Sequence, residues 1–123
     1  MDLKKLLFLK AAGGGSLPGH FPEDMLQVGY MGSSGDWHKS STNNQVATIK
    51  PLDTRLKSVT ADSDHTVSAF WYKKDGTYVN KSTGQTKYAS FDFSTYDYVI
   101  VIRRVGGANL DVKEAASAVT LGY

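Results

Sequence analysis

The three histidines are the first residues to consider for chemistry, because imidazole titrates near neutral pH and binds zinc. They are His20, His38 and His65. They lie far apart along the chain, and none belongs to a His-Glu-x-x-His helix or another compact zinc motif. A zinc site would have to be assembled from distant loops. We interpret all three as surface histidines and predict no metal site.

Carboxylates offer two further kinds of chemistry. Asp62, Asp64 and Asp75 could supply oxygen ligands to calcium, but Asp62-Ser63-Asp64 lacks the glycine and the distal glutamate of a calcium loop. A polar turn explains the same residues. Glycoside hydrolysis needs two carboxyl groups across a cleft. The two glutamates, Glu23 and Glu114, lie near opposite ends of the chain, and no pattern pairs them.

Nucleophilic and cofactor-dependent catalysis also lack a motif. The chain has no cysteine and no Gly-x-Ser-x-Gly elbow. The glycine-rich segment at 13–16 lacks the lysine and the preceding strand of a phosphate-binding loop. The sequence therefore predicts a protein that is not an enzyme and uses no cofactor.

Aromatic residues among polar ones suggest carbohydrate binding, because sugar rings stack on exposed aromatic faces. The segment 32–44, GSSGDWHKSSTNN, is predicted to be a loop and carries Trp37 and His38. Tyr78, Asn80 and Tyr88 are further candidate contacts. The alternative is that the loop tryptophan folds back and caps its own core.

The elements that would position these residues are mostly strands. In 65–72 and 96–104, alternating apolar side chains indicate central strands. Asp75-Gly76 between apolar runs predicts a hairpin turn over 73–77. Shorter strands are expected at 25–31, 45–50, 55–61, 78–79, 88–93 and 119–123, a polar loop at 81–85, and a helical turn within 112–118. Repeated short strands favour a mainly β, antiparallel β-sandwich.

The N-terminal segment is predicted to form a separate peg. Residues 2–12 can form a short helix, which needs a packing partner because isolated helices of this length are marginal. Its apolar stripe is Leu3, Leu6, Leu7 and Leu9, the predicted docking or oligomerisation surface. Gly13 to Ser16 form a flexible joint. We therefore divide the chain into a helical peg with its linker, 1–24, and a β-sandwich domain, 25–123.

Composition excludes several other classes. A chain of 123 residues suits one main domain, and a net charge of +2 with no basic cluster does not indicate a nucleic-acid partner. No apolar run is long enough to span a membrane. Lys10 interrupts the short apolar run at 6–9, so we predict no signal peptide.

The opening MDLKKLLFLKAAGGG resembles the start of minor structural and tail-associated proteins of prophages in Gram-positive gut bacteria. FWYKKDGTYV at 70–79 and YDYVIVIRR at 96–104 are similar to strands of a jelly-roll module in such proteins. The resemblance covers about 1–16 and 42–105. It implies a virion component assembled in the bacterial cytoplasm, often a homo-oligomer such as a trimer or a partner of other virion proteins, that helps attach to a host surface.

Two functions are therefore expected from the sequence. The first is a non-enzymatic phage or prophage structural protein with a jelly-roll-like sandwich and an N-terminal helix. The alternative is a carbohydrate-binding module that uses loop aromatics to bind a host-surface glycan.

Overall fold

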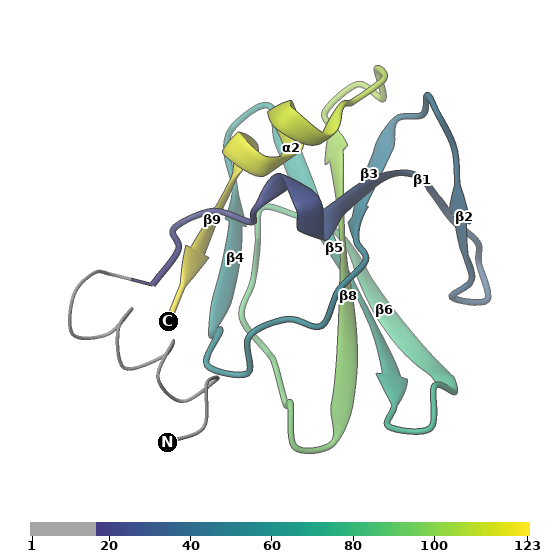
Figure 1. Ribbon diagram of the computed structural model, residues 1–123, viewed down its shortest axis with the longest axis vertical. Coiled ribbons are helices and arrows are strands. Elements are labelled where there is room, and N and C mark those ends of the chain that lie inside the picture. The colour runs from purple at the N-terminus through teal and green to yellow at the C-terminus, as the bar shows by residue number, and fades with distance from the viewer. Residues whose placement is uncertain (1–16) are drawn as a thin grey trace.

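The computed structural model describes residues 17–123 (Figure 1). The predicted helix over 2–12, its leucines Leu3, Leu6, Leu7 and Leu9, and the joint at 13–16 lie outside the described residues. Two β-sheets face each other, and a short helix, α2, lies at one end of them. In the described part of the chain the α-helix is thus close to the C-terminus, at Val112–Ala118.

All strand pairs are antiparallel. The larger sheet has the order β2-β1-β3-β8-β5-β6, and the smaller has the order β7-β4-β9. The strands of the larger sheet are β1 (Leu26–Met31), β2 (Trp37–Lys39), β3 (Gln45–Thr48), β5 (His65–Lys73), β6 (Tyr78–Gln85) and β8 (Tyr96–Arg104). Those of the smaller are β4 (Ser58–Ala61), β7 (Lys87–Tyr88) and β9 (Val119–Gly122). The prediction of a mainly β, antiparallel fold is confirmed, in an arrangement consistent with a β-sandwich.

β5 and β8 form the centre of the larger sheet, as their alternating pattern predicts. They pair along their whole length, from His65 opposite Arg104 to Lys73 opposite Tyr96. On the face toward the smaller sheet, Val67, Ile100 and Ile102 are fully buried. Burying one such aliphatic side chain contributes about 1.5–3 kcal/mol. This inner face therefore supplies the main core.

The hairpin at 73–77 is also confirmed, but the strand after it is longer than predicted. Gly76 has a φ of +92°, and the Lys73 N–H donates to the Thr77 carbonyl at 2.8 Å. The predicted polar loop at 81–85 is wrong, because these residues continue β6. They form the edge of the sheet, where backbone hydrogen bonds to β5 define the strand and most side chains face solvent.

Two other boundaries differ from the predictions. The strand expected over 88–93 ends at Tyr88, because Phe91 and Phe93 instead pack around the Tyr98 ring, with centroid distances of 5.0 and 5.4 Å. The loop expected over 32–44 contains the short strand β2, in which Trp37 lies opposite Met31. In both segments the secondary structure depends on pairing with a neighbouring strand rather than on amino-acid composition.

A second apolar cluster covers part of the outer face of the larger sheet, the face turned away from the smaller sheet. Ala47, Phe70 and Val101 are buried there, and Trp37 and the rings of β5 and β6 pack on them. The β1–β2 hairpin reaches across to these rings, since the Tyr72 hydroxyl donates to the Gly35 carbonyl at 2.7 Å. Burial raises the pKa of Tyr72 to about 12, which keeps this hydroxyl protonated as a donor.

The C-terminal segment, which contains α2 and β9 (Val119–Gly122), packs against the core and covers the end of the sandwich where α2 lies. Asp111 caps α2 by accepting a hydrogen bond from the Glu114 N–H at 2.8 Å. Ala115 and Ala118 are buried, and β9 then pairs with β4, which confirms the predicted helical turn and last strand. No helix within residues 17–123 has the length and apolar character needed to cross a membrane.

Candidate functional site

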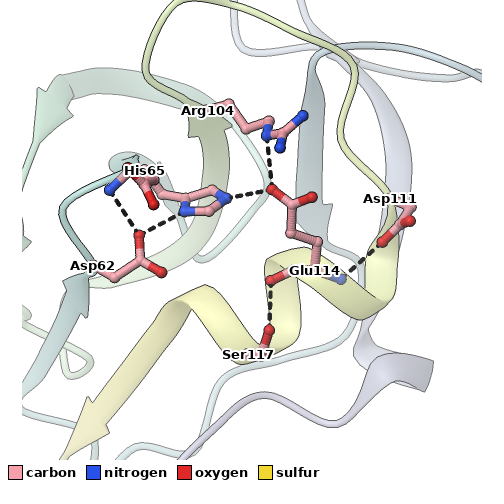
Figure 2. A network of polar contacts seen from close by, with 7 residues as sticks. Asp62, His65, Arg104, Asp111, Glu114 and Ser117 are labelled. Carbon is pink, nitrogen blue, oxygen red and sulfur yellow. Dashed lines mark hydrogen bonds and ion pairs between the residues drawn. The ribbon is translucent and has the colours of Figure 1, made fainter.

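A connected group of four ionisable side chains joins the start of β5, the end of β8 and α2 (Figure 2). His65 lies between two carboxylates. Its Nδ1 contacts Asp62 Oδ1 at 2.6 Å, and its Nε2 contacts Glu114 Oε2 at 2.7 Å. The same Glu114 oxygen contacts Arg104 Nε at 2.8 Å. The cluster thus connects the turn before β5, the end of β8 and the tail helix.

The carboxylates favour the charged form of this histidine. Burial alone would lower the pKa of His65, but the hydrogen bonds to Asp62 and Glu114 outweigh it and raise the pKa above its ordinary value of 6.5. The hydrogen bond from His65 holds the pKa of Asp62 below its ordinary value of 3.8. The two carboxylates thus favour an imidazolium between them, and Arg104 is a second cation beside Glu114.

This arrangement is suited to fastening the fold rather than to catalysis. Both ring nitrogens are already bonded to carboxylates, so neither is free to accept a proton from a nucleophile. The prediction that His65 is a surface residue is wrong, because the residue is buried, with only 7% of its surface exposed to solvent. Within the described chain, no group of three or more His, Asp or Glu side chains could hold a metal ion.

Trp37 and His38, the central candidates for sugar contacts, lie on β2 and face different ways. The Trp37 indole donates to Gln27 Oε1 at 2.9 Å and packs on the outer cluster, so it is half-buried. The exposed His38 ring stacks on Tyr30, with centroids 4.5 Å apart and planes 14° apart. Hydrogen bonds from Ser34 and then His38 keep the pKa of Asp36 below its ordinary value.

The other predicted sugar contacts do not form one site. Tyr78 packs on the same outer cluster as Trp37, and Asn80 lies exposed on β6. Tyr88 lies in the inner core with 7% of its surface exposed, so its ring face is covered. Tyr30, 44% exposed, is an aromatic that the sequence analysis missed. It lies in the strand expected at 25–31, where no residue was predicted to contact a ligand.

An open polar groove of about 380 Å³ crosses the outer face of the larger sheet, beside the cluster that Trp37 covers. Three cationic side chains line it: Lys81, Arg103 and Arg104. No Asp or Glu occurs among the described residues of its lining. The sequence does not indicate this site, because its residues come from strands whose order in the sheet the sequence does not reveal.

A second groove, of about 420 Å³, is apolar. It lies between residues 18–25 and residues 121–123 at the C-terminus. Its wall includes Phe21, Met25, Leu52 and Leu121. The carboxylate in its lining, Asp53, is hydrogen bonded to Arg55. Its residues therefore suit apolar contact rather than acid–base chemistry.

Comparison of the chain with protein-family models, with curated proteins and with solved structures found no match.

Proposed function

We propose that this chain is a non-enzymatic structural protein of a phage or prophage particle that contributes to attachment to the host surface. The observation that carries the non-enzymatic part is the His65 cluster. Both imidazole nitrogens are engaged by carboxylates, so this cluster lacks a free general base. The open groove on the outer sheet face supports a binding role, because Lys81, Thr83 and Arg103 of its lining are exposed to solvent.

The particle assignment is supported by the resemblance of 1–16 and 42–105 to prophage tail-associated proteins. The same proposal includes a jelly-roll form of the β-sandwich, which the two facing antiparallel sheets support. The proposal includes assembly in the bacterial cytoplasm and a place in the virion. It also includes self-association, for example as a trimer, or docking on another virion protein.

Deletion of residues 1–15 tests the assembly role. The deleted protein is expected to fold, because the described strands and core lie within 17–123, but to lose its assembly contacts. Light scattering should give a smaller mass than for the full chain. Mass spectrometry of particles from cells that carry either gene form should detect the full chain and not the deleted one.

The control is a full-length chain with Thr120→Ala, a change at an exposed position of β9. This variant should enter particles as the unchanged protein does. Absence of the full chain from purified particles would refute the particle assignment. An unchanged mass or an unfolded product after the deletion would refute the role given to the peg.

The alternative function is a carbohydrate-binding module, and one observation favours it. Tyr30 and His38 form an exposed aromatic pair on the β1–β2 hairpin, next to the polar residues Asp36 and Ser34. Such a pair can stack on a sugar ring while polar side chains contact its hydroxyl groups. Trp37 stabilises the hairpin through the hydrogen bond from its indole N–H on β2 to Gln27 on β1.

A glycan array checks this alternative. The unchanged protein should bind at least one neutral glycan, and Tyr30→Ala should weaken that binding about fivefold or more, since stacking on an aromatic ring contributes about 1–3 kcal/mol. Trp37→Ala is a less specific change, because it also removes the hydrogen bond to Gln27. The matched control is Lys39→Ala on the same strand. No binding by the unchanged protein removes this alternative, and binding that Tyr30→Ala retains removes the aromatic pair from it.

A further inference from the structure

The outer face of the larger sheet is divided into an apolar half and a polar half. Toward one end, Phe70 and Val101 lie under the β1–β2 hairpin. Toward the other end, the register places Gln45 of β3 opposite Arg103 of β8, and Arg103 opposite Thr66 of β5. Because residues that are directly opposite share a face, these three side chains form a polar row across three neighbouring strands.

The next residues in register extend this polar surface to the edge strand. Ser68 of β5 is two residues beyond Thr66 and therefore on the same face. Its hydroxyl oxygen accepts the Gly84 N–H of β6 at 3.2 Å. Thr83 and Lys81 of β6 complete the lining of the groove. Hydroxyl, amide and cationic groups thus converge on one open surface.

The charges of this groove are not balanced by its own residues. Within 17–123, Arg104 pairs with Glu114, whereas Arg103 and Lys81 have no ion-pair partner. Lys81 lies 5.9 Å from the centroid of the Phe70 ring, which forms part of the floor. Two unpaired cations in one groove repel each other, and an anion placed between them would be attracted to both.

The neutral polar groups indicate what else the ligand carries. The Gln45 side-chain oxygen accepts the Met31 N–H at 2.9 Å, so its amide N–H groups are the ones left to meet a ligand. The hydroxyls of Thr66 and Thr83 can each donate and accept hydrogen bonds, whereas Ser68 is 5% exposed and its oxygen already accepts the Gly84 N–H. Such groups are complementary to the hydroxyls of a sugar or polyol.

We propose that this groove binds an acidic saccharide, that is, a sugar or polyol unit that bears a phosphate or a carboxylate. Arg103 and Lys81 bind the anionic group, and Gln45, Thr66 and Thr83 bind the neighbouring hydroxyls. This inference rests on the proposed attachment role and names the chemical class of the surface ligand. It is a different site from the Tyr30–His38 pair, which suits a neutral sugar ring.

Single-stranded nucleic acid fits this groove less well. It is bound through a longer cationic track together with exposed aromatic rings on which bases stack. Phe70, the aromatic residue of the described lining, is 6% exposed and forms a floor rather than a stacking platform. A groove of about 380 Å³ is at the small end of the range for ligand pockets, which suits a small saccharide rather than a nucleic-acid strand.

Calorimetric titration of the full chain tests the proposal. The probes are oligogalacturonate, which carries carboxylates, and poly(glycerol phosphate), which carries phosphodiesters, with dextran as the neutral probe and a short single-stranded DNA as competitor. At least one acidic probe should bind, more weakly as salt increases, because salt screens exposed charges. Arg103→Gln and Lys81→Gln should each raise the Kd about tenfold or more, the factor for one charge-assisted hydrogen bond.

The matched control is Lys113→Gln, which removes one positive charge from an exposed position on α2 outside the groove. It should leave the Kd unchanged, and thermal unfolding should show that all three variants fold. The proposal is overturned if neither acidic probe binds, if dextran or DNA binds as tightly, or if Lys113→Gln weakens binding as much as Arg103→Gln. These outcomes do not depend on whether the protein enters particles, so failure of the two proposals can be told apart.

Discussion

Replacement of Ile100 by alanine is expected to lower the free energy of unfolding by about 2–5 kcal/mol. Ile100 is fully buried on the central strand β8, opposite Ala69 of β5. Its truncation leaves a cavity at the centre of the inner core, where neighbouring side chains close it only in part. The backbone around it is held in place, because the Ile100 N–H donates to the Thr48 hydroxyl at 3.0 Å in a buried environment.

Urea unfolding followed by circular dichroism measures this loss. The control is Val105→Ala, also an aliphatic truncation, at a position that is 63% exposed and just after β8. That change should alter the free energy of unfolding by no more than about 0.5 kcal/mol. A loss below about 1 kcal/mol for Ile100→Ala would mean that the two sheets do not pack over this residue.

Replacement of His65 by glutamine is expected to be the next most destabilising change, by about 1–3 kcal/mol. The neutral amide cannot replace the ion pairs that the imidazolium forms with Asp62 and Glu114. Figure 2 shows the contact between Glu114 and His65, which attaches α2 to the start of β5. The change would loosen this attachment. Arg104 would still pair with Glu114, which limits the loss.

The effect should depend on pH in a defined direction. The pKa of His65 is raised in the folded protein, so its stabilising effect is fully present below pH 6.5 and is lost as pH rises through the folded value. The pKa of Asp62 is lowered, so its contribution is present above 3.8 and is lost as pH falls through the folded value. The cluster therefore stabilises the fold most between these two pH values.

Thermal unfolding of the unchanged protein and of His65→Gln at about pH 6 and pH 8.5 checks this sign. The difference in Tm between the two proteins should be larger at the lower pH. His38→Gln is the matched control, because His38 is exposed and its pair with Asp36 lies at the surface, where ion pairs contribute little. A Tm difference that is equal at both pH values would contradict the charged histidine.

The central strands could be predicted because their pattern is local. In β8 the alternation of Tyr98, Ile100 and Ile102 with Val99 and Val101 already places two sets of side chains on two faces. The Asp75-Gly76 turn is equally local, since it depends on one residue that accepts positive φ. Both features were predicted at nearly their observed positions.

The edge of the sheet could not be predicted in the same way. β6 is polar over most of its length, because an edge strand gains its stability from backbone pairing rather than from burial of its side chains. By contrast, Phe91 and Phe93 looked like strand residues but pack as a loop around Tyr98. Composition indicated the wrong state in both segments.

The candidate sites depend on contacts between distant residues. His65 and Glu114 are 49 positions apart, and no pattern in the sequence pairs them before the fold brings α2 to the start of β5. The polar row of Gln45, Arg103 and Thr66 appears when β3, β8 and β5 are known to be neighbours. A partial signal was present, since Thr66 and Ser68 are polar residues on the outer face of a strand whose inner face is apolar.

We propose that the polar half of the outer sheet face is the ligand-binding surface of this protein. The most direct test is to titrate the ¹⁵N-labelled full chain with oligogalacturonate and with poly(glycerol phosphate), and to follow the backbone amide resonances. We expect shifts that cluster at Gln45, Thr66, Thr83 and Arg103. No shift with either probe, or shifts confined to the hairpin at 30–38, would contradict it.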